Sequence, residues 1–304
     1  MKKILASLLC VFALNAQAQA KENITIIYGF GPGDNSTNYS RNMANEANKM
    51  QNKYNFLFDV RPGAGQTIAV NYVKNTPNTI FMTSGAFWVR PNFYPNESYN
   101  VHDFKSLMTM CSVPFSIASV KYKSWNEVPK DRPTSIATSG LGVVSHLTAL
   151  QIMKNYPQMI LVPFKSTTEA VAATVGGQVD LVVGFLGDQE KWTSEDSKIK
   201  MSILGTTGPK PVGKYTNLSS QGFPAVLSKM NTPYVLMVPT TWSDDKVKEI
   251  RDILTKAETH SSVRKSYTLD HCQPFQVPGD KLQTWWNEQN ATWSGLTVGV
   301  KLEN

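Results

Sequence analysis

The sequence predicts an α/β protein with two similar lobes. Residues 24–83 and residues 134–185 each alternate short apolar runs with segments of helical spacing, in the order β-α-β-α-β. This order is typical of a parallel sheet whose connecting loops gather at one edge. The chain has 304 residues, which is enough for one large or two medium domains. Because the pattern occurs twice, we expect two α/β units.

The first repeat follows from the spacing of its apolar residues. Strands are expected at residues 24–28, 56–60 and 80–83, and a helical segment at residues 69–73. A longer helix is expected after the first strand, because four apolar residues recur there at intervals of four, four and three and so share one helical face. These residues are Tyr39, Met43, Ala47 and Met50.

The second repeat and the C-terminal region are predicted in the same way. The second repeat is expected to contain strands 134–138, 160–164 and 181–185, a helix at residues 144–152, and a turn followed by a helix within residues 165–175. A further strand is expected at residues 234–238, followed by two helices with apolar stripes. The stripes consist of Val247, Ile250, Leu254 and Ala257, and of Leu282, Trp285, Trp286 and Trp293. We interpret the tryptophans as core residues rather than as a cofactor site.

Residues 1–20 have the pattern of a secretory signal peptide. A short basic start precedes an apolar run at residues 4–14, and small residues offer cleavage after Ala18 or Ala20. The run is too short to span a bilayer, and no later stretch reaches the roughly eighteen apolar residues that a span requires. We therefore expect soluble export to the periplasm. A lipid anchor on Cys10 is the alternative, although Leu9 is larger than the residue that lipoprotein signals prefer at that position.

Charge and metal-ligand spacing exclude several classes of function. The formal net charge is +7, but the basic residues are scattered, whereas a nucleic-acid groove requires a dense basic stripe. The four histidines and the cysteines show no HxxxH or CxxC spacing, so no metal site is expected. Cys111 and Cys272 are either a disulfide or two separate buried thiols. A disulfide closing so long a loop would contribute about 4–5 kcal/mol in the chain-entropy model.

Two stretches look like enzyme motifs, and neither has the required geometry. Residues 29–33 place a glycine at every second position, but a dinucleotide fingerprint needs G-x-G-x-x-G, and Pro32 has no N–H to donate to a pyrophosphate. Ser145 and His146 are adjacent on a predicted helix, so they point about 100° apart and cannot act on each other as nucleophile and base. We therefore expect no catalytic residue and no cofactor.

A repeated type of turn favours ligand binding instead. Turns rich in glycine, serine and threonine join strands to helices at residues 31–37, 139–145 and 165–168, and Ser84–Ala86 is a fourth such segment. These turns supply neutral donors and helix N-termini, with few groups able to act as acid or base. Such donors can hold a carboxylate through charge-assisted hydrogen bonds without catalysis.

With these stretches in view, the chain resembles the Bug/TctC family, the periplasmic solute receptors of tripartite tricarboxylate transporters. The resemblance extends over nearly the whole mature sequence and is carried by seven segments in the family's order. They are "GFGPGDNSTNYSRNMANE", "VRPGAGQTIAVNYVKNTPNTIFMTS", "PNFYPNESYNVHDFKSLMTMCSVPFSIA", "SGLGVVSHL", "VPFKST", "GGQVD" and "SSQGFPA".

The resemblance implies a type II periplasmic binding protein fold, in which two α/β lobes joined by two hinge crossovers close on a small ligand. It places the crossovers near residues 119 and 232. The expected division is a signal peptide at 1–20, lobe one at 21–118 and 233–304, and lobe two at 119–232.

Position by position, the resemblance also implies a set of ligand-binding residues. They are Phe30, Gly33, Asp34, Asn35, Thr37, Ser84, Ala86, Ser139, Gly142, Ser145, Phe164, Ser166 and Gly184. Several depart from the family pattern: Asp34 replaces a glycine, Thr37 replaces an acidic residue, and Gly184 stands where many members have an acid. An ionised Asp34 in the cleft would oppose a dianion and could pair with an ammonium group. Alternatively, Asp34 faces solvent and favours the positive end of the helix.

The resemblance implies a non-catalytic, exported and monomeric receptor. Its ligand is expected to be a small polar organic solute that carries a carboxylate, and its partner a membrane permease. The first alternative is a ligand-sensing protein that docks on a membrane sensor. A more distant one is an exported hydrolase that uses Ser145 or Ser139.

Overall fold

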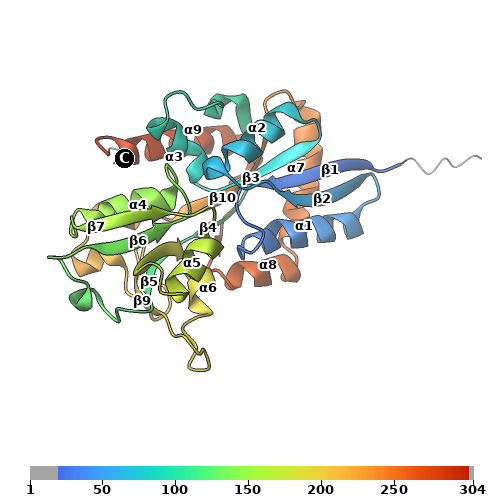
Figure 1. The fold of residues 1–304 in the computed structure, drawn as a ribbon. Helices are drawn as coiled ribbons and strands as arrows, with labels where there is room; N and C mark the ends of the chain where they lie inside the picture. Colours follow the sequence, from blue (N-terminus) through green and yellow to red (C-terminus); the bar gives the residue numbers. More distant parts are fainter. Residues whose placement is uncertain (1–19, 301–304) are drawn as a thin grey trace, which may run out of the picture.

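Two sheets, each packed against helices, form two lobes in this computed structural model (Figure 1). The structure describes residues 20–300, so the predicted signal peptide lies outside the described residues except for Ala20. The α/β fold with two lobes is confirmed. Within residues 20–300, no helix has the length and apolar character needed to cross a bilayer.

Lobe one contains a six-stranded sheet with the strand order β11-β4-β10-β3-β1-β2. Its strands are β1 (Glu22–Tyr28), β2 (Tyr54–Val60), β3 (Thr79–Thr83), β4 (Phe104–Val113), β10 (Thr232–Pro239) and β11 (Gln273–Pro274). The helices of this lobe are α1 (Thr37–Met50), α2 (Thr67–Asn75), α3 (Ala86–Phe93), α7 (Asp244–Glu258), α8 (Ser261–Thr268) and α9 (Leu282–Thr297). β1 runs parallel to β2 and β3, whereas β10 is antiparallel to both β3 and β4. The parallel part is the first predicted repeat.

Lobe two contains a five-stranded sheet with the order β7-β6-β8-β5-β9. Its strands are β5 (Phe115–Ser119), β6 (Thr134–Thr138), β7 (Met159–Pro163), β8 (Leu181–Phe185) and β9 (Ser202–Thr206). Its helices are α4 (Val144–Met153), α5 (Thr167–Val175) and α6 (Leu186–Glu190). β6 runs parallel to β7 and β8, and β5 is antiparallel to β8 and β9. The three parallel strands are the second predicted repeat.

The first crossover lies earlier than predicted. The predicted boundary places residues 115–118 in lobe one. In the structure these residues belong to β5, which pairs with β8 and β9 of lobe two. The chain changes sheets at Pro114, the single residue between β4 and β5. Proline has no N–H to donate to a strand ladder, which explains why pairing in the first sheet stops there. The return connection runs through residues 207–231 and enters lobe one at the start of β10.

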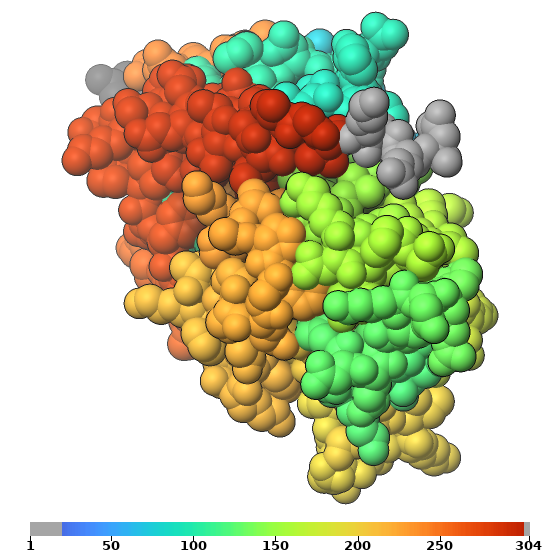
Figure 2. Space-filling model, turned by 90° about the vertical axis from the view of Figure 1, so that its left-hand side faces the viewer, coloured from blue at the N-terminus to red at the C-terminus, as the bar shows by residue number. Residues whose placement is uncertain are grey.

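The predicted apolar stripes mostly face the core. Tyr39, Met43 and Ala47 on α1 are fully buried, but Met50 is 37% exposed because it ends the helix, where the chain turns back toward β2. On α9, Trp286 and Trp293 are buried. The space-filling view shows α9, in red, lying across lobe one, and the two lobes meeting along the visible face (Figure 2).

Cys111 and Cys272 are joined by a disulfide, the first of the two alternatives that the sequence leaves open. Cys111 lies in β4, and Cys272 lies in the turn between α8 and β11. The bond therefore ties the C-terminal part of lobe one to its N-terminal part, close to the first crossover.

Candidate functional site

A small buried cavity lies between the two lobes. Ten residues line it: Phe30, Ser84 and Ala86 from lobe one, and Phe115, Ser139, Val143, Val144, Ser145, Thr167 and Phe185 from lobe two. Its volume is about 10 Å³, which is room for about one water molecule. The two lobes are therefore closed on each other, and a ligand can enter only if they separate.

Three helices begin at this cavity. Ala86, Val144 and Thr167 are the first residues of α3, α4 and α5 and all line it. First-turn amides have no acceptor inside their own helix. Among the described residues, none of these three N–H groups donates a hydrogen bond elsewhere. Because the positive ends of three helix dipoles converge here, the cavity favours a negatively charged group.

Serine and threonine hydroxyls add further donors to the same wall. The Ser145 hydroxyl accepts a hydrogen bond from the Ser139 amide at 3.1 Å and lies 2.9 Å from the Ser139 hydroxyl. This pair fixes the turn that leads into α4. Within the described part of the chain, the hydroxyls of Ser84 and Thr167 make no hydrogen bond, so both are free for a ligand.

The remaining walls are apolar. The rings of Phe115 and Phe185 stack with their centroids 4.7 Å apart, because β5 and β8 pair these two residues directly. Phe30 lies against Tyr28, and Val143 precedes the first turn of α4. Donors thus occupy one part of the lining and hydrocarbon the rest.

Five of the residues expected at the site line this cavity. They are Phe30, Ser84, Ala86, Ser139 and Ser145. Five lining residues were not expected: Phe115, Val143, Val144, Thr167 and Phe185. The two valines and Thr167 fall inside the glycine- and serine-rich turns that the sequence singles out, so their place was within reach of the same reasoning. The two phenylalanines carry no such signal.

The structure gives four other expected residues local roles away from the cavity wall. The Gly142 N–H donates to Nδ1 of His146 at 2.9 Å. The Ser166 hydroxyl accepts from the Glu169 amide at 3.2 Å and so caps α5. Thr37 uses its hydroxyl on the carbonyl of Asp34, 2.8 Å away.

Phe164 is the fourth of them, and it packs beside the core of lobe two. Gly184 lies behind the wall, where a β-carbon would come within 2.8 Å of Gln189 and Thr167. A larger residue at position 184 would therefore disturb the cavity from behind without facing a ligand.

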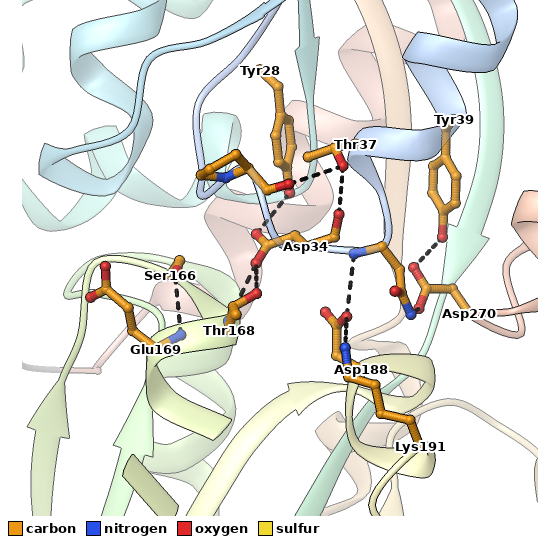
Figure 3. A network of polar contacts seen from close by, with 12 residues as sticks. Tyr28, Asp34, Thr37, Tyr39, Ser166, Thr168, Glu169, Asp188, Lys191 and Asp270 are labelled. Carbon is orange, nitrogen blue, oxygen red and sulfur yellow. Dashed lines mark hydrogen bonds and ion pairs between the residues drawn. The ribbon is translucent and has the colours of Figure 1, made fainter. Parts of the chain in front are cut away.

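Asp34 does not face solvent, so that alternative is wrong, and it lies between the lobes without lining the cavity itself. Its side chain is 1% exposed and reaches across to lobe two, where Oδ1 accepts hydrogen bonds from the Thr168 hydroxyl at 2.8 Å and the Thr168 amide at 3.3 Å. The Tyr28 hydroxyl donates to its other oxygen at 3.4 Å. Figure 3 shows Asp34 between the two lobes, directed at the first turn of α5. Gly33, beside it, packs against the same threonine.

Two further buried acids lie near Asp34, and the three form an interlobe carboxylate cluster (Asp34, Asp188 and Asp270; Figure 3). Asp188 belongs to α6 of lobe two, whereas Asp270 follows α8 of lobe one. Asn35 joins them, because its amide N–H donates to Asp188 at 3.2 Å and its side chain donates to Asp270 at 3.1 Å. The Tyr39 hydroxyl donates to the second oxygen of Asp270.

Burial makes the acids of this cluster weak. It raises the pKa of Asp34 to about 6, against the hydrogen bonds from Thr168. Burial also raises the pKa of Asp188 well above its usual range, and the charges of Asp270 and Asp34 add to the shift. The pKa of Asp270 is raised by burial too. Within residues 20–300, one oxygen of Asp188 has no hydrogen-bond partner, and the Lys191 ammonium lies 3.6 Å from the other. When the lobes are closed, these carboxyl groups therefore keep protons that they would release if the lobes moved apart and exposed them to water.

His146 and Ser145 do not interact as a catalytic pair. The Ser145 hydroxyl is hydrogen-bonded to Ser139, and the imidazole accepts from Gly142 and packs against Phe93, with ring centroids 5.9 Å apart. Burial lowers the pKa of His146 to about 4, so the ring is neutral near pH 7.

The comparison with protein families identifies the chain. A family model described as the tripartite tricarboxylate transporter family receptor, TctC, matches residues 40–300. The chain belongs to this family. The resemblance to Bug/TctC receptors is therefore confirmed. A curated relative, the "UPF0065 protein in gbd 5'region" of Cupriavidus necator, is 22% identical over 281 residues, which cover 87% of this chain and 84% of the relative.

Solved structures of similar proteins share the fold of this TctC receptor. The periplasmic binding protein BugD superposes with a TM-score of 0.81 at 18% identity and covers 91% of this chain and 96% of its own. An R. palustris protein solved with adipate superposes with a TM-score of 0.78 at 17% identity, and the match covers 92% of this chain and 97% of that protein. MatC from Rhodopseudomonas palustris, solved with bound malate, superposes with a TM-score of 0.75 at 18% identity, and the match covers 90% of this chain and 98% of MatC. At these identities the likeness establishes the type II periplasmic binding fold.

Proposed function

We propose that this TctC receptor binds a small solute through a carboxylate group in the interlobe cavity and delivers it to a membrane permease. The observation that carries the proposal is the convergence of α3, α4 and α5, whose N-termini all begin at one buried cavity. Backbone N–H groups at helix N-termini bind anions well, and a buried site strengthens each such hydrogen bond.

The cavity draws donors from both lobes, which supports a closing mechanism. Ser84 and Ala86 belong to lobe one, whereas Ser139, Ser145 and Thr167 belong to lobe two. A carboxylate held by both sets would favour the closed arrangement, because it interacts fully only when the lobes meet. Pro114 and residues 207–231, the two connections between the sheets, would act as the hinge.

Two of the similar structures contain carboxylates, malate in one and adipate in the other. We extend the carboxyl group, and not the identity of either acid, to this receptor. Residues 1–20 support export to the periplasm, and the family supports a permease partner. We propose that the receptor works as a monomer. We also propose that it catalyses no reaction, since Ser145 and His146 are each hydrogen-bonded to another residue and do not pair as nucleophile and base.

The proposal is tested by a thermal-shift screen of the mature protein against mono-, di- and tricarboxylates and their neutral amides at pH 7.5. A ligand at one hundred times its dissociation constant adds about 2.7 kcal/mol of stability. We expect at least one acid to raise the melting temperature while its amide does not. A rise with neutral solutes alone, or with no acid, would contradict the proposal.

Calorimetry on two variants then locates the site. Ser145→Ala removes a cavity hydroxyl and should weaken binding about 10- to 150-fold, the effect of losing about 1.5–3 kcal/mol from a hydrogen bond to a charged group. Ser124→Ala is the matched control, since Ser124 is an exposed serine of lobe two that does not line the cavity. Equal affinities of the two variants would show that the ligand binds elsewhere.

A further inference from the structure

We infer that the ligand of this receptor carries one carboxylate on an apolar body, rather than two or three carboxylates. The inference rests on the proposed function and concerns the same cavity. It is argued from the arrangement of the donors, the chemistry of the remaining walls and the charges around the site.

The donors converge on a single position. Ala86, Val144 and Thr167 start three different helices, yet all three line one cavity of about 10 Å³. This is the volume of about one water molecule, so the lobes must move apart to take a ligand, but the three helix starts face one common space. In the closed receptor, the three amides and the nearby hydroxyls are therefore placed to share one anionic group, and they do not form two separate anion sites.

The walls beyond the donors offer nothing to a second carboxylate. They consist of the rings of Phe30, Phe115 and Phe185 and the side chains of Val143 and Val144. Burying an ionised carboxylate against hydrocarbon without a hydrogen-bond donor is strongly unfavourable. An aliphatic or aromatic body, in contrast, gains free energy by leaving water for such a surface.

Within residues 20–300, the cavity wall supplies no cation to offset a second negative charge. Among the described residues that line the cavity, none carries a charge. Arg90 reaches the turn before α4, where it donates to the carbonyl of Leu141 at 3.0 Å. Its charge is already matched by Glu97, 2.5 Å away.

Above pH 6, Asp34 of the interlobe carboxylate cluster adds negative charge near the third helix. Asp34 takes both the amide and the hydroxyl of Thr168, the residue that follows Thr167 in the first turn of α5. Part of the anion-binding capacity of α5 is thus already used by the protein itself. An ionised Asp34 also repels a ligand in proportion to the ligand's negative charge. A dianion therefore loses more binding free energy than a monoanion does.

The test compares acids that share a skeleton and differ by one carboxylate. The pairs are butanoate with succinate, hexanoate with adipate, and benzoate with terephthalate, measured by calorimetry on the mature protein at pH 7.5 with hexanamide as the neutral control. In at least one pair the monoacid should bind ten-fold or more tightly than the diacid. Diacids that bind as tightly as their partners, or more tightly, would overturn the inference and leave the proposed function intact. Absence of binding by every acid would overturn both.

A variant tests the contribution of Asp34. Asp34→Asn keeps an oxygen to accept from Thr168 but removes the charge. The ratio of diacid to monoacid affinity should rise at least three-fold, and this ratio cancels any change in lobe closure that affects both ligands equally. Asp280→Asn, which removes an exposed aspartate of lobe one, should leave the ratio unchanged. An unchanged ratio in Asp34→Asn would overturn the role assigned to Asp34.

Discussion

Replacing Asp34 with asparagine should stabilise the protein above pH 6 and make its stability less dependent on pH. The carboxyl group is buried between the lobes, and burial raises its pKa to about 6 from 3.8. Between these two values the folded protein keeps a proton that the unfolded chain releases. The free energy of unfolding therefore falls as the pH rises through this window, and the loss is complete above pH 6.

The size of the effect follows from the two pKa values. A difference of about two pH units corresponds to about 3 kcal/mol. Asparagine is nearly isosteric with aspartate, so the oxygen that accepts from Thr168 is retained and little packing is lost. Asp34→Asn should thus differ little from the wild type at pH 4 and be more stable by up to about 3 kcal/mol at pH 7.5.

The assay is urea denaturation of the wild type, Asp34→Asn and the exposed control Asp280→Asn at four pH values from 4 to 7.5. The quantity of interest is the stability difference between each variant and the wild type, because Asp188 and Asp270 also have raised pKa values and shape the wild-type curve. If the difference for Asp34→Asn were the same at pH 4 and pH 7.5, the assignment of a buried, destabilised charge to Asp34 would be refuted.

Three further predictions concern closure, the disulfide and the buried histidine. Gly187→Ala should hold the lobes apart, because the added β-carbon would lie 2.1 Å from the carbonyl oxygen of Leu269 in lobe one; small-angle scattering should report a larger radius of gyration, while Gly295→Ala, at an open position on α9, should leave it unchanged. Reducing the bond between Cys111 and Cys272 should lower the free energy of unfolding by about 5 kcal/mol in the chain-entropy model for a loop of 161 residues; a denaturation midpoint that does not move on reduction would contradict this. Burial lowers the pKa of His146 to about 4 from 6.5, so the wild type should lose up to about 3 kcal/mol as the pH falls through that window. The free energy of unfolding of His146→Gln should fall less between pH 7 and pH 4 than that of the wild type. Urea denaturation at the two pH values measures this, and equal losses in the two proteins would contradict the reasoning.

Local sequence pattern was sufficient for elements bounded by turn residues. The strands of the second repeat end at glycine-, serine- and threonine-rich turns, and their observed bounds lie within a residue of the prediction. β4 was not predicted, because it is buried almost throughout and lacks the alternation that marks a half-buried strand. α3 contains Pro91, which interrupts the helical pattern.

The candidate site divides in the same way. Helix N-termini are marked by glycine, serine and threonine in a few consecutive residues. The turns that hold Ser84, Ser139 and Ser145 could therefore be predicted from the sequence. The stacked pair of Phe115 and Phe185 depends on the pairing of two strands far apart in the chain. The bond from Asp34 to Thr168 likewise joins residues 134 positions apart. Interactions at this separation are fixed by the packed fold, so no local pattern could reveal them.

The place of β10 in the first sheet sets an order of assembly during synthesis. β10 lies between β3 and β4, although all of lobe two separates it from them along the chain. A growing chain that has reached Thr206 contains every strand of the second sheet, whereas β4 still lacks both of its neighbours, β10 and β11. Such non-local pairing slows folding, because a long loop must close before the contacts form. Lobe two can therefore form early with the starts of α4 and α5 in place, and the cleft is completed last, when the C-terminal residues join the two halves of lobe one.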